Sequence, residues 1–424
     1  MVLDGLTSFM LITVNLVTFL VAIYSISYME KYTDKWKFWT LFMLMLAGMN
    51  GVIITGDMFN LFVFLEISAI SSYALVAFGT EAEELEASFK YAIMGSVASS
   101  FILLGVAILY SHTSTLNMAD MANVLSEKSS DLLKFVSVLF LMGFGLKAAL
   151  VPFHAWLPDA HPSAPASISA MLSGIFIKVL GIYALSRIVF NVFGLTPLIS
   201  SIFITLGILS MILGGFLAFG QIDIKRLYAY SSISQIGYIT LSLGLGTPQG
   251  VMAGLFHLFN HSLFKSLLFL NSGAIESVTQ TRDLRRMGGL MQKAPLISYT
   301  NIIGAMSISG IPPLNGFFSK LLIVLACIQA KRLDLATAAI LVSILTLIYY
   351  LKATGMAFFG TAKTQNSAKK ISFSMNFSLV ILSILCLIGG LILIPNVSDI
   401  FLKKAVNALL NGKNYANLVF EALK

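Results

Sequence analysis

The chain alternates between long hydrophobic runs and short polar connections. A helix rises about 1.5 Å per residue, so a run of about twenty apolar residues crosses the hydrocarbon layer of a membrane. Runs of this kind lie near residues 4–29, 37–55, 57–78, 88–110, 133–151, 163–187, 193–219, 226–246, 249–271, 294–327, 333–358 and 371–395. The pattern predicts an all-α integral membrane protein with about twelve transmembrane helices.

Composition excludes a water-soluble protein. Of the 424 residues, 57% are hydrophobic and 11% are charged, whereas about 25% of residues are charged in soluble domains. The longest polar connections, 111–132 and 275–293, are too short to fold alone. After Asn396 apolar residues and lysines mix in a pattern typical of an amphipathic surface helix. Its apolar members are Phe401, Leu402, Ala405, Leu409 and Leu410.

The distribution of charge predicts how the chain is oriented. Its net charge of +8 fits a membrane protein whose cytoplasmic loops are basic, and needs no nucleic acid to explain it. One face collects Lys31, Lys35, Lys37, Lys90, Lys225, Arg226, Arg282, Arg285, Arg286, Lys293, Lys363, Lys369 and Lys370. The other has Lys128, Lys134, Arg187, Lys331, Arg332, Lys403, Lys404, Lys413 and Lys424. We therefore expect the 30–37 connection in the cytoplasm, both termini outside the inner (plasma) membrane, and no cleaved signal peptide.

Ionisable side chains interrupt several of the apolar runs. A charge at the centre of a membrane helix costs roughly 2.5–3.5 kcal/mol, so such residues usually mark an ion path. The candidates are Glu66, Lys147, Lys178, His257, His261, Lys265 and Lys320. The alternative is that charged side chains lie near helix ends and reach the headgroups. That explanation suits three other charged residues, Lys90, Arg187 and Lys352. It does not account for all seven candidates.

Two runs contain proline-rich interruptions, at 150–158 and 310–318. Proline removes a helix donor and clashes with the preceding turn, so each should break its helix. Each break has a lysine close by, Lys147 or Lys320. Matched broken helices in two halves of a transporter indicate inverted repeats. We expect two repeats of five helices, 37–187 and 193–358, after a leading helix (1–36) and before a last helix and amphipathic tail (359–424). The alternative is that these prolines only end helices at the surface.

No cofactor or metal site is evident. Cys327 and Cys386 stand alone in apolar runs without a partner at metal-ligand spacing, and core packing explains them. His257 and His261 lie four residues apart on one helix face, but no nearby carboxylate or thiol completes a zinc site. Haem ligated by two histidines usually takes them from different helices. We expect no bound metal and no redox cofactor.

The remaining polar residues have plainer explanations. His154 and His161 flank the first break, where proton uptake and simple loop hydrogen bonding are both open. Asp57 can cap the start of the helix that carries Glu66. An acidic run in a short connection fits a solvated face, with cation collection as the alternative; it comprises Glu81, Glu83, Glu84 and Glu86.

Four segments in order resemble one family. They are NLFVFLEI (60–67), GLKAALVPFHAWLPDAH (145–161), DIKRLYAYSSISQ (223–235) and GIPP (310–313). Together they look like the antiporter-like subunits of respiratory complex I, over nearly the whole chain. The segments DAHP (159–162) and FFSK (317–320) are most similar to the D-type subunit of Mrp sodium/proton antiporters and to its relatives in membrane-bound hydrogenases.

The resemblance implies roles for individual residues. Glu66 matches the family's glutamate that pairs with a lysine on the first broken helix, and Lys147 matches that lysine. Lys178 matches the middle of a polar axis along the membrane plane, and Lys320 matches its terminal residue. His257 and His261 fall on the helix before the second break. A nearby carboxylate favours a charged lysine, so separating the Glu66–Lys147 pair would release a proton to the axis.

The resemblance also implies partners. Family members have two further helices before the segment that matches 4–29, so either another small membrane subunit supplies them or the complex tolerates the gap. Sister antiporter subunits and a peripheral iron–sulfur redox arm are the other expected partners. The long amphipathic arm of the longest family members has no counterpart after the last run.

These inferences lead to one expected function and two alternatives. We expect a proton-translocating or sodium/proton-exchanging subunit of a multisubunit complex, coupled to a redox module or to sister subunits, without catalytic chemistry of its own. The first alternative is a subunit that takes part in quinone or hydrogen chemistry itself, but the sequence has no cluster-binding cysteines and no dinucleotide fingerprint. The second is an exporter of organic solutes, which would need a roomy cavity.

Overall fold

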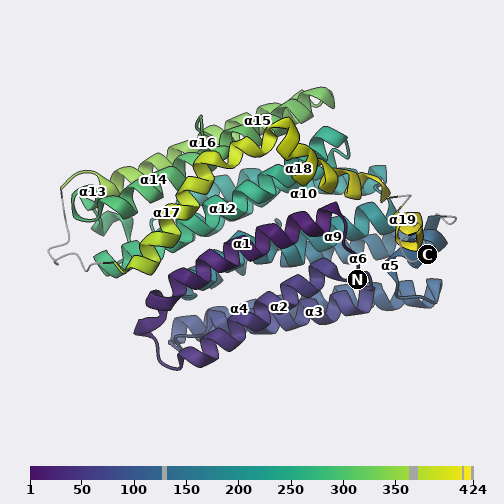
Figure 1. The fold of residues 1–424 in the computed structure, drawn as a ribbon, viewed down its shortest axis with the longest axis horizontal. Coiled ribbons are helices and arrows are strands. Elements are labelled where there is room, and N and C mark those ends of the chain that lie inside the picture. The colour runs from purple at the N-terminus through teal and green to yellow at the C-terminus, as the bar shows by residue number, and fades with distance from the viewer. Residues whose placement is uncertain (127–130, 362–370, 413–414, 422–424) are drawn as a thin grey trace.

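The chain is described by a computed structural model covering residues 1–126, 131–361, 371–412 and 415–421. Within these ranges it is almost entirely helical and has no β-strand, which confirms the predicted all-α class. Long helices lie roughly alongside one another, and the start of the chain lies at the same end of the bundle as α19 (Tyr415–Glu421) (Figure 1). Some lysines used to predict orientation are outside the described residues: Lys128, Lys363, Lys369, Lys370, Lys413 and Lys424.

The first half begins with one helix and continues to a long central one. Its elements are α1 (Gly5–Tyr28), η1 (Met29–Lys31), α2 (Lys35–Ile54), α3 (Met58–Val76), α4 (Ala82–Thr113), α5 (Met118–Ser126), α6 (Asp131–Lys147), α7 (Leu157–Ser163), α8 (Ala166–Met171), η2 (Leu172–Phe176), η3 (Lys178–Tyr183), α9 (Ala184–Arg187) and η4 (Ile188–Phe193). The elements from α8 to η4 follow one another as a single helix, called here the central helix. Three of its stretches, η2, η3 and η4, have π-helical hydrogen bonding.

The second half has a similar order of elements. They are α10 (Pro197–Phe219), α11 (Ile224–Gly244), α12 (Pro248–Thr279), η5 (Leu284–Arg286), α13 (Leu290–Lys293), α14 (Pro295–Ser309), α15 (Asn315–Gln329), α16 (Leu333–Phe358), α17 (Phe373–Ile388), η6 (Gly389–Leu393), α18 (Pro395–Leu410) and α19. Every one of the twelve predicted runs is therefore helical in the structure.

Eight helices among the described residues are long and apolar enough to cross a membrane. The four predicted runs outside this set contain α6, α11, α12 and the pair α14 and α15. Two of these runs are limited by length, since α6 has 17 residues and α14 and α15 have 15 each. The other two are long but more polar, and α12 carries two histidines and a lysine in its interior. Most of the ionisable candidates thus lie on the helices with the weakest membrane-spanning character.

Both predicted helix breaks are confirmed. Helix α6 ends at Lys147 and the next helix begins at Leu157, while α14 ends at Ser309 and α15 begins at Asn315. The predicted cap of α3 is also confirmed, because the Asp57 side chain accepts a hydrogen bond of 2.8 Å from the backbone N–H of Asn60.

Two isolated backbone bridges relate the halves of the chain. One joins Asp57, before α3, to Asn117, after α4; the other joins Asp223, before α11, to Asp283, after α12. Sixty residues separate the partners in both cases. In each half the bridge ties the start of one long helix to the end of the next.

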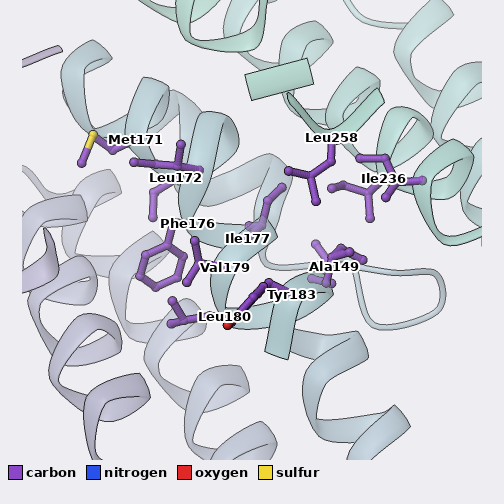
Figure 2. Packing of buried hydrophobic residues seen from close by; sticks show 14 of the residues in the cluster. Ala149, Met171, Leu172, Phe176, Ile177, Val179, Leu180, Tyr183, Ile236 and Leu258 are labelled. Atoms are coloured by element: carbon purple, nitrogen blue, oxygen red, sulfur yellow. The ribbon is translucent and has the colours of Figure 1, made fainter. Parts of the chain in front are cut away.

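The central helix is the core of the bundle. Its apolar window is buried along its entire length, whereas the other membrane-length helices among the described residues bury 33–56% of theirs. Figure 2 shows Leu172, Phe176 and Ile177 of this helix in the same packed layer as Ile236 of α11 and Leu258 of α12. Any ionisable side chain on the central helix is therefore surrounded by protein rather than by lipid.

Arg187 does not reach the headgroups, and that prediction is wrong. It lies at the end of α9, almost fully buried, and its guanidinium donates two hydrogen bonds to the carboxylate of Asp4, of 2.6 and 2.9 Å. Thr7 and Asn191 accept further bonds. The carboxylate compensates the buried charge, which removes the need to reach solvent. Lys90 and Lys352 are exposed, as predicted.

Helix α18 confirms the predicted amphipathic pattern of the tail. It buries Leu402, Ala405 and Leu409, and Phe401 packs its ring against Phe9 of α1 and a phenylalanine of α12. Ile400, on the opposite side, is 71% exposed. The apolar face of α18 thus packs against the bundle.

Candidate functional site

The Glu66–Lys147 pair is the predicted pair that the structure brings into contact. The cap at Asp57 starts α3 and places Glu66 in the middle of that helix, while Lys147 is the last residue of α6 before the first break. Lys147 Nζ lies 3.5 Å from Glu66 Oε1, with the lysine side chain 3% exposed and the glutamate 26% exposed. The hydroxyl of Ser99 donates to Glu66, and Lys147 donates a long hydrogen bond of 3.4 Å to Tyr73.

Lys178 lies on the central helix and is fully buried. Its ammonium donates hydrogen bonds of 2.5 and 2.6 Å to the backbone carbonyls of Ser173 and Gly174, one turn earlier. The backbone is π-helical on both sides of this turn, a rare geometry that is frequent at functional sites. Among the described residues Lys178 has no ion-pair partner, and its Nζ is hydrogen-bonded only to backbone carbonyls.

Lys265 has a similar neutral environment on α12. Its ammonium donates to the backbone carbonyl of Tyr228 at 2.6 Å and to Ser231 Oγ at 3.0 Å, with the Tyr350 hydroxyl at 3.4 Å. All three partners come from α11 and α16, so the lysine joins three helices. No carboxylate forms an ion pair with it in the described part of the chain.

The two histidines of α12 have different partners. The His257 ring lies between Ser319, 2.9 Å from Nδ1, and Gln235, 3.1 Å from Nε2. His261 is buried, and neither of its ring nitrogens has a hydrogen-bond partner within the described ranges. The rings are nearly parallel, with centroids 6.2 Å apart. The two histidines therefore differ: His257 is hydrogen-bonded at both ring nitrogens, and His261 at neither within the described ranges.

Lys320 follows the second break, on α15. It is buried, donates to Ser343 Oγ at 3.1 Å, and has its ammonium 5.1 Å from the centre of the Tyr238 ring. Ser343 in turn donates to the carbonyl of Ser309, the last residue of α14. A lysine reaching for headgroups would be exposed, so the burial of Lys320 argues against that explanation.

The histidines of the first break are separated by the structure. His154 lies in the break itself and is partly exposed, while His161 lies on α7 and is fully buried. The His161 ring stacks on Phe269 of α12 at a centroid distance of 4.5 Å. Neither ring nitrogen of His161 has a hydrogen-bond partner among the residues described. Loop hydrogen bonding therefore does not explain His161.

Contacts join most of these groups into one buried set. The His257 and His261 rings lie 6.2 Å apart, and His257 contacts Ser319, the residue before Lys320. Ser266, the residue after Lys265, donates to the Ala170 carbonyl of the central helix. The set reaches from the central helix to the second break.

Close packing joins this set to the first break. A side-chain carbon at Gly181 on the central helix would lie 2.5–2.7 Å from atoms of Ala148, the residue after Lys147. The glycine therefore allows the end of α6 to touch the helix that carries Lys178. In the described ranges no hydrogen bond joins Lys147 to Lys178.

The sequence did not indicate the neutral partners of these ionisable residues. Seryl and tyrosyl hydroxyls supply most of them: Ser99, Ser231, Ser319, Ser343, Tyr73 and Tyr350. Hydroxyl residues are common in membrane helices, so a single sequence gives no signal that selects these. The described residues contain no cluster of three or more His, Cys, Asp or Glu side chains able to hold a metal ion.

Comparison with known proteins identifies the family. The family described as "NADH:quinone oxidoreductase/Mrp antiporter, TM" matches residues 55–348, and "NADH-Ubiquinone oxidoreductase (complex I), chain 5 N-terminus" matches residues 1–39. The D-type subunit of a Na⁺/H⁺ antiporter from Alkalihalophilus pseudofirmus is 35% identical over 86% of this chain and 74% of its own length.

Two solved structures are similar over nearly the whole chain. One is the Mrp complex of a Dietzia species, with a TM-score of 0.92 and 29% identity over 98% of this chain and 86% of that one. The other is a membrane-bound sulfane sulfur reductase, an archaeal respiratory membrane complex, with a TM-score of 0.89 and 33% identity over 97% and 84% of the two chains. The fold, the buried lysines and these matches agree: the chain belongs to the membrane family of complex I and Mrp antiporter subunits.

Proposed function

We propose that this chain moves protons along a buried axis formed by Glu66, Lys147, Lys178, His257, His261, Lys265 and Lys320, as one subunit of a larger membrane complex. One observation carries the proposal. Of the buried lysines on this axis, Lys147 alone has a carboxylate partner among the described residues, while the other lysines have only carbonyls and hydroxyls. Static packing gives no reason to bury three lysines without counter-charges, since each costs several kcal/mol if charged.

The Glu66–Lys147 pair is the switch in this proposal. At 3.5 Å the carboxylate stabilises the ammonium of Lys147. When Glu66 moves away or takes up a proton, that stabilisation is lost and Lys147 passes its proton toward Lys178, whose neutral amine becomes an ammonium. Repulsion between like charges then drives the proton onward through the histidines. The pair recovers when Lys147 is protonated again.

The architecture proposed with this function has twelve transmembrane helices and two inverted repeats, 37–187 and 193–358, between a leading helix (1–36) and a last helix with its tail (359–424). The matched backbone bridges support it. The bridge at Asp57 lies beside the cavity formed by the N-terminal residues, whereas Asp223 lies 3.4 Å from Arg282 at the opposite end of the bundle. Equivalent features at opposite ends are the expected consequence of inversion.

The relatives support the proposed partners. Antiporter and respiratory complexes contain several membrane subunits, so we place this chain beside sister subunits and a small subunit that supplies two helices. Protons are the proposed cargo, with sodium exchange and a peripheral iron–sulfur arm as further features of the complex. The proposed location is the inner (plasma) membrane, with both termini outside. Mass spectrometry of the intact complex tests the partner set.

Transport by a Glu66→Gln variant tests the function. Glutamine has nearly the same volume but carries no charge, so the complex should assemble while proton movement falls by on the order of a hundredfold. The measurement is pH change in proteoliposomes at equal assembled amounts. Glu86→Gln is the control, because Glu86 is an exposed carboxylate of the neighbouring helix, paired with Lys90. Normal transport by Glu66→Gln would remove Glu66 from the mechanism.

A further inference from the structure

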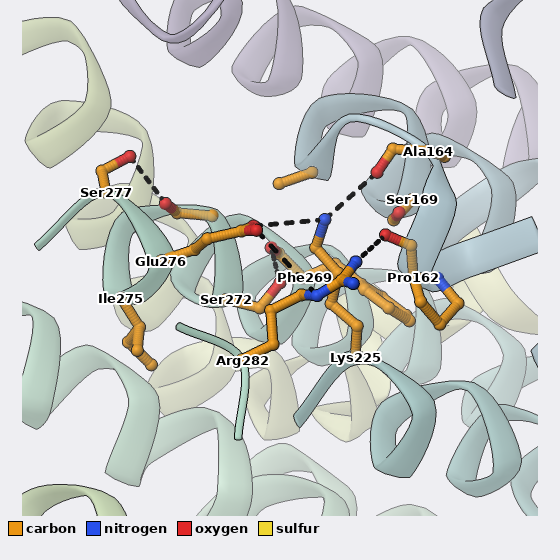
Figure 3. Close-up of polar contacts among 12 residues, drawn as sticks. Pro162, Ala164, Ser169, Lys225, Phe269, Ser272, Ile275, Glu276, Ser277 and Arg282 are labelled. Carbon is orange, nitrogen blue, oxygen red and sulfur yellow. Dashed lines mark hydrogen bonds and ion pairs between the residues drawn. The ribbon is translucent and has the colours of Figure 1, made fainter. Parts of the chain in front are cut away.

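A second carboxylate–lysine pair lies away from the axis, at the end of the bundle that carries residues 29–34. Lys225, in the first turn of α11, has its ammonium 3.4 Å from Glu276 Oε2, near the end of α12 (Figure 3). The lysine side chain is 3% exposed and the glutamate 30% exposed. The pair therefore reaches from the accessible surface into the protein interior. Its role is not explained by the axis described above.

Arg282 completes this cluster and holds it in place. Its guanidinium lies 3.4 Å from Asp223 and 4.0 Å from Glu276, and it donates to the backbone carbonyl of Pro162. Lys225 donates a hydrogen bond of 3.1 Å to the carbonyl of Ala164. The two cations thus bind the last turn of α7 and the residue that follows it (Figure 3). Arginine does not lose its proton in proteins, so Lys225 is the member of the cluster able to release one.

His161 lies just before the residues that the two cations bind. It is completely buried, and both of its ring nitrogens lack a hydrogen-bond partner in the described ranges. Buried polar atoms are nearly always paired, because an unpaired one costs free energy. The His161 ring stacks on Phe269, and the ammonium of Lys265 lies 5.8 Å from the centre of the same Phe269 ring. His161 therefore lies between the chain segment that Lys225 contacts at Ala164 and the ring beside Lys265.

We propose that Glu276 and Lys225 form a proton-collecting pair that delivers protons from the 29–34 end of the bundle to His161, and through it to Lys265. This proposal rests on the proposed function, since it names the uptake route for the same axis. The surface-facing Glu276 is the collector, Lys225 is the carrier, and His161 is the first buried acceptor.

The transfer balances in three steps. Water at the surface gives a proton to the Glu276 carboxylate, which becomes a neutral acid and no longer stabilises the ammonium of Lys225. Lys225 then gives a proton to a ring nitrogen of His161, forming a neutral amine and an imidazolium. The Glu276 acid returns its proton to Lys225, which restores the ion pair. The net change is one proton moved from water to His161.

Other titratable groups face this pair and stay in place when Glu276 is changed. They come from α1, the 29–34 connection, α4, the α10–α11 connection and the α12–η5 connection: Tyr24, Tyr28, Lys31, Tyr32, Glu84, Asp223 and Arg282. Because Glu276→Gln and Glu276→Asp both keep these groups, a difference between the two variants reports on the carboxylate at position 276.

The experiment measures proton uptake by the whole complex in proteoliposomes while the pH is varied only on the side of the 29–34 connection. Glu276→Gln should slow uptake about tenfold at high pH and much less at low pH, because abundant protons then reach His161 without the collector. Glu276→Asp, which keeps a carboxylate, should retain most of the rate. Glu86→Gln is the matched control, since it removes an exposed carboxylate at the same end.

The outcomes separate this proposal from the function on which it rests. A loss in Glu276→Gln that shrinks as the pH falls on that side, with Glu276→Asp active, supports the collecting pair. An unchanged rate at every pH, or an equal loss at every pH, overturns it and makes the pair structural. If the unmodified complex moves no protons at all, the proposed function fails instead.

Discussion

Lys147 at the end of α6 and Lys265 inside α12 are both buried, but their surroundings differ. Lys147 lies 3.5 Å from the carboxylate of Glu66, whereas Lys265 is held by a backbone carbonyl and two hydroxyls. A lysine beside a carboxylate gains stability as an ammonium, and a lysine among neutral dipoles gains much less. The same side chain is thus buried in two ways. The carboxylate beside Lys147 favours the charged ammonium, whereas the neutral groups around Lys265 favour it much less.

Arg187 is a third case, a buried cation that is fully paired. Its guanidinium has the Asp4 carboxylate and two further side-chain acceptors. Full satisfaction of this kind suits a structural charge that never changes. Lys178, Lys265 and Lys320 have no comparable partner among the described residues. On the proposed path a carboxylate therefore pairs with Lys147, while the other three lysines have only neutral partners.

The largest effect should come from removing a lysine of either kind. Lys147→Ala and Lys178→Ala each interrupt a relay in series, so both should reduce proton movement by on the order of a hundredfold. Transport is measured in proteoliposomes at equal assembled amounts. If one of the two variants pumps normally, that lysine is not part of the proposed path.

The next test asks whether Lys320 must lose its proton. Lys320→Arg keeps the positive charge but cannot release it, so transport should fall about as far as in the alanine variants. Lys320→Glu can still carry a proton and should retain part of the rate. Both are compared at matched assembly by the same assay. An active Lys320→Arg complex would show that this lysine has only a structural role.

A smaller effect is expected when Lys265 is given the partner that Lys147 has. Ser231→Asp places a carboxylate where a hydroxyl now lies 3.0 Å from the ammonium. The lysine should then stay charged, and transport should slow about tenfold, which is about 1.4 kcal/mol of added barrier.

Ser231→Asn is the control for this change. It has nearly the same size as the aspartate variant and carries no charge. Equal rates in the two variants would mean that the neutral surroundings of Lys265 are irrelevant to transport, and the contrast with Lys147 would lose its meaning.

The smallest effect concerns the contact between the two regions. Gly181→Ala adds a carbon within 2.5–2.7 Å of Ala148, so the central helix and the end of α6 must separate. Overpacking of this kind costs roughly 1–3 kcal/mol of stability. Thermal unfolding of the purified complex and its transport rate are the measurements. Gly355→Ala on α16 is the matched helical control, because a carbon there meets open space.

Hydropathy and residue type, both local properties, determined the helices of this protein, their breaks and the list of candidate ionisable residues. The twelve runs are helical, both proline breaks occur where proline removes a donor, and Asp57 caps α3. The same property singled out the seven ionisable residues, because a lysine in an apolar run stands out without knowledge of any partner. The four-segment resemblance then indicated the family, which the comparisons show.

Apart from Glu66 and Lys147, whose pairing the resemblance implied, tertiary structure decided which groups pair. Arg187 and Asp4 are 183 residues apart, and Lys265 and Tyr350 are 85 apart. Lys225, expected in a loop, is buried against Glu276 instead. Helix packing brings such residues together, and no periodicity along the chain encodes which of many serines or tyrosines will face a given lysine. The sequence therefore determined which helices carry ionisable residues. The packing of the helices decided whether each of these residues has a partner of opposite charge or only neutral partners.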